Sequence, residues 1–257
     1  MYLEKLRLDN RVAVVTGGGR NIGLACGQAL AEAGATVVIT DLDSDLIASG
    51  RESIEAAGGR TDGTVMDVTS TESVNAAAAD ILQRHGQIDI LVCNAGFARS
   101  DTPAEDVTDE HWLKIIEINL NGVFRCCRAF GRPMLERGKG AIVNIGSMSG
   151  FIVNKPQPQC QYNASKAGVH HLTKSLAAEW APRGVRVNAV APTYIETTLT
   201  RFGMDDPDMY SVWLENTPMK RVGQPDEIAS VVLFLASDAA SLMTGSIVLA
   251  DGGYSCW

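Results

Sequence analysis

The sequence predicts a doubly wound α/β fold, in which one parallel sheet lies between two layers of helices. Short β-branched segments alternate along the chain with longer segments of helical spacing. The β-branched segments are apolar almost throughout, which is typical of strands that are buried on both faces of a parallel sheet. The 257 residues contain no linker rich in Pro, Gly or Ser. We therefore expect a single α/β domain over residues 1–257.

The first half of the chain gives the clearest elements. VAVVT at 12–16 and TVVITD at 36–41 predict strands, and the helical segment Asn21–Ala33 between them ends before Gly34, a common C-terminal residue of helices. The same alternation then repeats once more before the middle of the chain. It predicts a helix at Asp45–Ala57, a strand at Thr64–Asp67 and a helix at Ser70–His85.

The second half continues the alternation and contains one exception. Strands are expected at Ile88–Asn94, Ala141–Gly146, Val185–Ala191 and Ser246–Ala250, with helices at Asp109–Arg137, Gln161–Trp180 and Asp226–Ala236. The exception is Pro192–Val222, which is long, irregular in pattern and follows the end of a strand. Because α/β folds place ligands at such ends, we expect a substrate flap at about 192–222.

Composition excludes several classes of function. The net charge is −8 and no basic stripe is present, which argues against nucleic acid as a partner. The six cysteines show neither a CxxC pair nor a Cys/His cluster of zinc spacing, so no metal site is expected. The first residues, MYLEKLRLDN, lack the apolar core of a signal peptide, and no apolar run has the length of a membrane span. These features predict a cytoplasmic protein without a membrane partner.

A glycine-rich segment, TGGGRNIG at 16–23, lies between the first strand and the first helix. Glycines let the backbone approach a pyrophosphate closely, and a helix N-terminus offers free N–H groups to an anion. This placement predicts a dinucleotide site of the Rossmann type.

Acidic and small residues at the next strand ends extend this site. Asp41 ends the second strand, where a carboxylate binds ribose hydroxyls and repels a 2′-phosphate, which favours NAD. Arg20 in the glycine loop favours NADP, and Asp41 could instead be a solvated strand-end carboxylate; we give Asp41 the greater weight. Asp67 and the Asn94-Ala95-Gly96 segment lie at strand ends from which they could reach the adenosine.

Candidate catalytic residues follow the fifth expected strand. Tyr162 and Lys166 stand at i and i+4, on one face of a helix. A nearby ammonium stabilises a phenolate, and bringing a phenol pKa from about 10 to about 7 requires roughly 4 kcal/mol. Ser147 lies just past the strand, where its hydroxyl could hold a substrate oxygen, and Ser149 is the competing serine. Asn119 either holds a water that connects Lys166 to solvent or ties two elements together.

These residues resemble the short-chain dehydrogenase/reductase family over nearly the whole length of the chain. The resemblance is carried by TGGGRNIG at 16–23, NAG at 94–96, Asn119, VNIGS at 143–147, YNASK at 162–166, VRVNAVAP at 185–192 and DGG at 251–253. GSMSG, LAAEWA at 176–181 and the ending GGYSCW are similar to the polyol dehydrogenase branch of that family, of the galactitol dehydrogenase type.

The resemblance implies a role for each matching residue. Tyr162 would be the general acid and base, Lys166 would bind the nicotinamide ribose and lower the tyrosine pKa, and Asn119 would complete a proton relay. Cofactor contacts would come from Gly17, Asn21, Ile22, Gly23, Asp41, Asp67, Val68, Asn94, Ala95, Gly96, Tyr162, Lys166, Pro192, Ile195 and Thr197. Substrate contacts would come from Ser147, Ser149, Asn154, Gln159 and Tyr162.

The chain departs from the family pattern at four places. Asn21 replaces a glycine, and asparagine tolerates a positive φ better than most residues. Cys93 replaces an asparagine and Thr193 a glycine. Ser147 precedes Tyr162 by 15 residues where 13 is commoner. The longer loop at 151–161 should then line the substrate pocket, where its amides suit a polyol; alternatively these amides face solvent.

Together, the residues and the resemblance predict an NAD-dependent enzyme that interconverts a secondary alcohol of a polyol and the corresponding ketone. One alternative is an NADPH-dependent 3-oxoacyl-thioester reductase, with Arg20 setting the cofactor preference. Another is a non-catalytic dinucleotide-binding regulatory protein, which has no need of the Ser147, Tyr162, Lys166 and Asn119 set. The family resemblance also implies a homotetramer.

Overall fold

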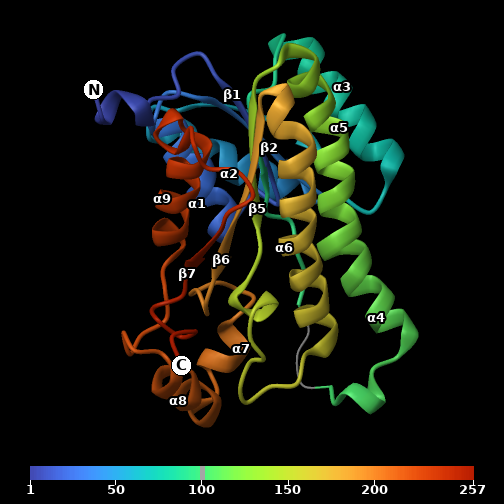
Figure 1. Ribbon diagram of the computed structural model, residues 1–257, viewed down its shortest axis with the longest axis vertical. Helices are drawn as coiled ribbons and strands as arrows, with labels where there is room; N and C mark the ends of the chain where they lie inside the picture. Colours follow the sequence, from blue (N-terminus) through green and yellow to red (C-terminus); the bar gives the residue numbers. More distant parts are fainter. Residues whose placement is uncertain (99–101) are drawn as a thin grey trace.

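The computed structural model describes residues 1–98 and 102–257. Within these residues, seven parallel strands form one sheet in the order β3-β2-β1-β4-β5-β6-β7 (Figure 1). The strands are β1 (Val12–Thr16), β2 (Thr36–Asp41), β3 (Arg60–Val65), β4 (Ile90–Cys93), β5 (Gly140–Ile145), β6 (Val185–Pro192) and β7 (Ile247–Ala250). The predicted doubly wound fold is confirmed.

Helices cover both faces of the sheet. One layer contains α1 (Asn21–Glu32), α2 (Ser44–Ala56) and α9 (Pro225–Ala236), which share a core with alternate residues of β1 and β2. The other contains α3 (Thr71–His85), α5 (Gly122–Arg137) and α6 (Cys160–Trp180). Val14 and Val15 of β1, both fully buried, belong to the two different cores. Alternate side chains of one strand therefore hold both layers.

The strand order reverses between β1 and β4, because the chain crosses from one half of the sheet to the other. β1 pairs with β2 on one side and with β4 on the other, all in parallel register. The loops that leave the carboxyl ends of β1 and β4 diverge at this point. In open α/β sheets a crevice forms there, and ligands bind in it.

The third strand lies earlier than the sequence predicted. β3 spans Arg60–Val65 rather than Thr64–Asp67, and it pairs with the whole of β2, from Thr36 opposite Arg60 to Asp41 opposite Val65. This edge strand, RTDGTV, is partly exposed throughout. Its polar composition lacks the apolar run of a buried strand, so the sequence predicts the strand too late, at the apolar residues around its C-terminal end.

The long helix predicted at Asp109–Arg137 is interrupted. α4 (Asp109–Ile116) runs into a π-helical turn at Glu117–Asn121, and α5 continues from there. A π turn inserts a residue without breaking the helix axis and is frequent at functional sites. The turn contains Asn119, which is fully buried.

The segment at 192–222 is more regular than its sequence suggested. It contains two helices, α7 (Arg201–Met204) and α8 (Pro207–Asn216), at the lower end of the molecule in Figure 1. Trp213 of α8 is buried and stacks on Tyr194, with ring centroids 3.8 Å apart. This aromatic pair fixes α8 to the chain that leaves β6.

Within the part of the chain that the structure describes, no helix combines the length and apolar character needed to cross a bilayer.

Candidate active site

A cavity of about 790 Å³ opens at the carboxyl edge of the sheet. Residues at or just beyond the ends of β1, β2, β4, β5 and β6 line it, as the crevice at the reversal of strand order predicts. Nearly all of the residues expected from the sequence lie on its wall, namely Gly17, Asn21, Ile22, Asp41, Asp67, Val68, Asn94, Ala95, Gly96, Ser147, Ser149, Asn154, Gln159, Tyr162, Lys166, Pro192, Ile195 and Thr197. Gly23 and Asn119 stand behind the wall.

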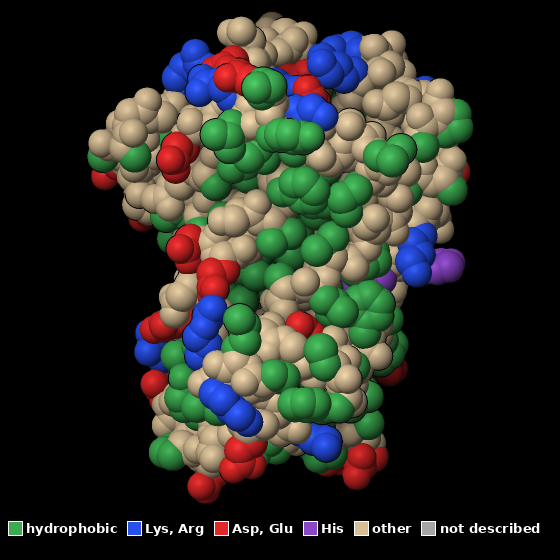
Figure 2. Space-filling model, turned by 60° about the vertical axis from the view of Figure 1, so that its left-hand side comes forward, with side chains coloured by type: hydrophobic (Ala, Val, Ile, Leu, Met, Phe, Trp, Pro, Cys, Tyr) green, Lys and Arg blue, Asp and Glu red, His purple; other side chains and the backbone are tan. Residues whose placement is uncertain are grey.

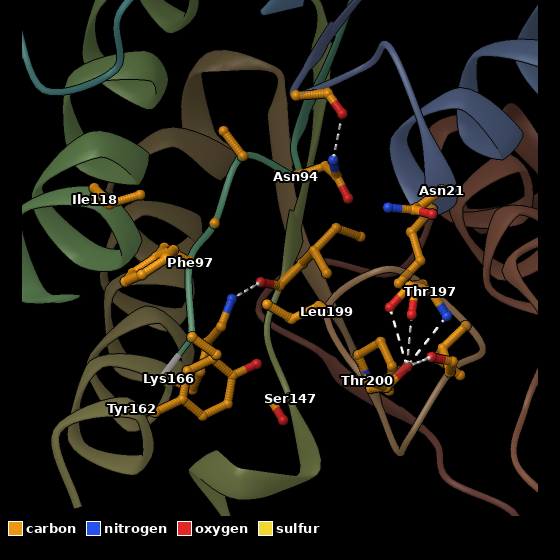
Figure 3. Close-up of a pocket in the computed structure, with 18 of the residues that line it drawn as sticks. Asn21, Asn94, Phe97, Ile118, Ser147, Tyr162, Lys166, Thr197, Leu199 and Thr200 are labelled. Atoms are coloured by element: carbon orange, nitrogen blue, oxygen red, sulfur yellow. Dashed lines mark hydrogen bonds between the residues drawn. The ribbon is translucent and has the colours of Figure 1, made fainter. Parts of the chain in front are cut away.

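The glycine loop is held in a shape that only certain residues allow. Gly17 has φ +60° and Asn21 has φ +51°, both in the left-handed region. A Cβ on Gly23 would overlap the Gly17 carbonyl oxygen, so a glycine is needed where α1 approaches the loop. Asn94 donates its amide hydrogens to the carbonyl oxygens of Thr16 (3.0 Å) and Gly17 (2.9 Å), which ties the loop to β4 (Figure 3).

The two residues that bear on cofactor preference both line the cavity. Asp41 accepts a hydrogen bond from the backbone N–H of Leu42 at 2.8 Å, which fixes its carboxylate at the end of β2. Arg20 is exposed on the same wall. Both therefore remain candidates for contact with the adenosine ribose.

Asn21 also connects the glycine loop to the segment at 192–222. Its side-chain amide donates to the Thr198 hydroxyl at 2.9 Å. The residue thus supports the positive φ that its position requires and joins two walls of the cavity across 177 residues of sequence.

These walls fit a dinucleotide. Gly17 and Gly23 form a cradle in which added side chains would collide, and the N-terminus of α1 faces it. At the far wall, the buried hydroxyl oxygen of Thr193 has no hydrogen-bond partner among the described residues. A buried polar atom of this kind calls for a partner, and the carboxamide of a nicotinamide provides one.

Tyr162 and Lys166 extend from one face of α6, as their spacing predicted (Figure 3). The Lys166 ammonium donates to the Ile145 carbonyl oxygen at the end of β5, at 2.8 Å. Its nitrogen lies 5.6 Å from the centroid of the Tyr162 ring. The ammonium is therefore beside the phenol ring and bound to the sheet, rather than to the phenol oxygen.

The pKa values of this pair differ from the sequence expectation. Desolvation raises the pKa of Tyr162 above its ordinary value of 10.0, and a hydrogen bond with the Ser147 side chain lowers it by less. Burial lowers the pKa of Lys166 to about 8. In the protein alone, withdrawal from water dominates both groups, because the ammonium does not reach the phenol oxygen.

Ser147 is the serine beside Tyr162. Its hydroxyl also donates to the Ser149 hydroxyl at 2.9 Å and accepts from the Ser149 backbone N–H at 3.1 Å. Both serines are buried and line the cavity. Ser149 thus holds the Ser147 side chain through two hydrogen bonds.

The side chain of Asn119 ties two elements together. Its oxygen accepts from the backbone N–H of Phe97 and its amide donates to the Phe97 carbonyl, both at 2.8 Å. The amide also donates to the Ser165 hydroxyl at 3.2 Å. The loop after β4 is thereby held against α6, which is the second of the two interpretations. The proton-relay role of Asn119 stays a prediction.

The amides of the 151–161 loop turn inward. Asn154, Gln157 and Gln159 are at most 7% exposed, so they do not face solvent. Asn154 and Gln157 each donate to the Tyr194 phenol oxygen at 3.1 Å, and Gln159 donates to Asn154 at 2.9 Å. The loop lines the cavity as expected.

Several lining residues were not expected from the sequence. Tyr194 follows the end of β6 and Trp213 comes from α8, and the Trp213 indole donates to Gln157 at 3.1 Å. Aromatic residues in an otherwise polar segment were the available signal. Other lining residues that the sequence did not single out include Phe97, Met148, Leu199, Thr200 and Phe202.

A doubly wound sheet with a glycine cradle, and a tyrosine, lysine and serine at its carboxyl edge, defines the class of Rossmann-type oxidoreductases that use a dinucleotide. Residues 17–255 match a family model described as "Enoyl-(Acyl carrier protein) reductase". The chain belongs to the short-chain dehydrogenase/reductase family. The resemblance found in the sequence is confirmed.

Individual relatives are close. The chain is 54% identical over 256 residues to the galactitol 2-dehydrogenase of Rhizobium johnstonii (strain DSM 114642 / LMG 32736 / 3841), which covers 100% of this chain and 99% of that protein. The crystal structure of gox2181 has a TM-score of 0.99 at 63% identity, with both chains fully covered. A gluconate 5-dehydrogenase from Burkholderia cenocepacia J2315, crystallised in complex with NADP and tartrate, has a TM-score of 0.95 at 37% identity, again over both full chains.

Proposed function

We propose that the protein is an NAD-dependent dehydrogenase that interconverts a secondary alcohol of a polyol and the corresponding ketone. The observation that carries the proposal is the polar lining at the Tyr162 end of the cavity. Hydroxyl and amide groups of Ser147, Ser149, Asn154 and Gln159 gather there and are buried. A substrate rich in hydroxyl groups can exchange hydrogen bonds with such a wall, whereas the hydrocarbon part of an acyl chain offers it neither donors nor acceptors.

In this proposal each catalytic residue acts on the substrate hydroxyl. Tyr162 removes the hydroxyl proton during oxidation and returns it during reduction, and Ser147 holds the substrate oxygen against the tyrosine. Lys166, which is held in place by its hydrogen bond to the Ile145 carbonyl, orients the nicotinamide ribose. It supplies positive charge when the pH is below its pKa of about 8. When bound, NAD⁺ supplies the acceptor for the hydride.

The choice of NAD over NADP rests on Asp41. A carboxylate at the end of β2 repels a 2′-phosphate, and its hydrogen bond to Leu42 keeps it in place. The gluconate 5-dehydrogenase noted above was crystallised with NADP, and Arg20 on the wall of this cavity is the residue that would favour that cofactor.

We also propose that residues 192–222 form the substrate flap of one catalytic domain over 1–257. Leu199, Thr200, Phe202 and Trp213 of this segment line the cavity, and Thr198 connects it to Asn21. The flap is thus in contact with both the dinucleotide loop and the expected substrate wall.

The surface supports a homotetramer. Figure 2 shows apolar side chains gathered along the face that carries α9 and β7, where Phe234 and Leu249 are exposed. Trp112, Leu113 and Phe124 of α4 and α5 are exposed on another side of the chain. Two separate apolar faces suit an assembly with two kinds of interface.

A cytoplasmic location is part of the same proposal. All six cysteines, which lie within the described residues, are free thiols, and Cys160 and Cys256 are exposed. Exposed free thiols persist in a reducing compartment.

A polyol panel tests the function directly. The purified protein is mixed with NAD⁺ or NADP⁺ and with galactitol, another polyol or a primary alcohol, and formation of the reduced cofactor is followed by absorbance. In a separate assay it is mixed with NADPH and a 3-oxoacyl thioester, and consumption of NADPH is followed in the same way. Turnover of one or more polyols with NAD⁺ is expected. Turnover confined to the thioester, or the absence of turnover with every polyol, would overturn the proposal.

A further inference from the structure

His170 is a buried titratable residue behind the catalytic face of α6. It stands one turn beyond Lys166 and two turns beyond Tyr162, and it is 5% exposed. It does not line the cavity. Its ring lies instead against the turn that carries Ser147.

The turn at 146–151 is wrapped around the imidazole. The Ser147 backbone N–H donates to His170 Nε2 at 3.5 Å, a long hydrogen bond. A Cβ on Gly146 would come within 2.5 Å of Nε2, and one on Gly150 would overlap the ring. Phe151 completes the contact, with its ring centroid 4.5 Å from that of the imidazole. The two glycines on either side of Ser147 therefore make room for this ring.

This placement carries a polar cost. Because Nε2 accepts, the ring proton resides on Nδ1, and Nδ1 is buried without a partner among the residues that the structure describes. Burial, together with the positive charges of Lys166 and Lys174, lowers the pKa of His170 to about 4, so the ring is neutral at pH 7. An apolar side chain would fill the same space and would avoid the unpaired Nδ1. A histidine is therefore explained here by its Nε2, which accepts from the Ser147 backbone N–H.

We propose that His170 is a positioning residue, which fixes the backbone of Ser147 through Nε2 and so directs the Ser147 hydroxyl toward Tyr162. The inference rests on the proposed function, since it concerns the same serine. It assigns to His170 no contact with substrate or cofactor.

The test compares His170→Leu, which removes the acceptor, with His170→Gln, whose side-chain oxygen can take the place of Nε2. His171→Leu, at the exposed neighbouring position on α6, is the control. With galactitol and NAD⁺, His170→Leu is expected to lower kcat about 10- to 100-fold, the scale of a small misplacement of a catalytic group. The dissociation constant for NADH should not change. His170→Gln should recover most of kcat, and His171→Leu should retain it.

A double-mutant cycle separates positioning from general destabilisation. If His170 acts through Ser147, then His170→Leu should cost less than about 2-fold once Ser147 is already alanine. The same loss in both backgrounds, or no loss in either, contradicts the inference. Should His170→Leu not fold, His170→Met takes its place in the cycle.

Amide hydrogen exchange gives a readout that does not depend on turnover. Exchange in the peptide that contains residues 146–151 should be faster in His170→Leu than in the wild-type protein, and unchanged in His171→Leu. If no polyol is turned over but the exchange rises, the proposed function fails and the link from His170 to Ser147 stands. Unchanged exchange contradicts the inference whatever the activity.

Discussion

Tyr162 and Lys166 share one face of α6, yet the ammonium is bound to the Ile145 carbonyl and not to the phenol. Their spacing predicted their common face, because a helix brings residues i and i+4 together. It could not predict the rotamer of the lysine, which depends on a carbonyl 21 residues away. The raised pKa of Tyr162 follows from its desolvation by burial, which the spacing could not predict either.

The same limit applies to the polar wall of the cavity. Asn154 and Gln159 were expected to contact substrate, and they line the cavity. The hydrogen-bond partners in this loop could not be predicted, because they come from distant parts of the chain. Asn154 bonds to Tyr194, 40 residues away, and the nearby Gln157 bonds to Trp213, 56 residues away. Side-chain networks between distant segments leave no periodic trace in a sequence.

The two serines of the turn should differ in their effect on activity. We expect Ser147→Ala to lower kcat about 100-fold or more, because its hydroxyl neighbours Tyr162 and would hold the substrate oxygen. Ser149→Ala should cost about 10-fold or less, because Ser149 acts through its bond to Ser147. Steady-state rates with galactitol and NAD⁺ measure both variants, and a larger loss in Ser149→Ala would exchange their roles.

Asp41 should set the cofactor preference. Asp41→Ala removes both the acceptor for the ribose hydroxyls and the repulsion of a 2′-phosphate, so the ratio of kcat/KM for NAD⁺ over NADP⁺ should fall about 10-fold or more. Asp45→Ala, which removes the same charge from the start of α2 outside the cavity wall, is the control. An unchanged ratio in Asp41→Ala would show that this carboxylate is only solvated.

At the scale of elements, the sequence predicted what burial determines. Strands buried on both faces, such as β1 and β5, lie where their apolar runs predicted. β3 was misplaced because an edge strand with one exposed face lacks that run. The π turn at Glu117–Asn121 was missed because an added residue leaves the apolar spacing on either side intact.

The close approach of α1 to the glycine loop gives a prediction about an element as a unit. In Gly23→Ala the new Cβ meets the Gly17 carbonyl oxygen, so α1 must shift from the loop. We expect weaker binding of NADH and a loss of about 1–3 kcal/mol in the free energy of unfolding. Fluorescence titration and urea denaturation measure these effects.

Gly27→Ala on the same helix is the matched control. Its Cβ would lie 3.1 Å from Cδ1 of Ile54, the end of a flexible side chain that can move. Equal losses of NADH affinity in the two variants would contradict the special role of Gly23.

At the scale of the whole molecule, two hydrophobic cores hold the sheet between its helical layers, and the cavity opens where the strand order reverses. This architecture was predictable, since apolar alternation and connection rules leave few topologies. The helices of the proposed flap were not predictable, because α7 and α8 are short and pack through single aromatic residues such as Trp213.

The buried His170 predicts how global stability depends on pH. In the unfolded chain the His170 imidazole takes up a proton near pH 6.5, whereas in the folded protein its pKa is lowered to about 4. The contribution of the neutral imidazole to the free energy of unfolding is therefore fully present above pH 6.5 and is lost as the pH falls toward 4. From pH 7.5 to pH 5 the free energy of unfolding should drop by about 2 kcal/mol from this group.

Urea denaturation at one protein concentration measures this dependence. In His170→Gln the drop between pH 7.5 and pH 5 should shrink by about that 2 kcal/mol. An equal drop in the free energy of unfolding in both proteins would mean that groups other than His170 cause the loss of stability at low pH.

The central claim is that Tyr162 transfers the proton at the substrate oxygen, and Tyr162→Phe tests it most directly. The variant keeps the ring and removes only the hydroxyl, so the rate of NAD⁺ reduction with galactitol should fall by about 100- to 10,000-fold. Fluorescence titration with NADH should give a dissociation constant within about 3-fold of wild type, a difference of less than 1 kcal/mol. Turnover at the wild-type rate in Tyr162→Phe would contradict the account.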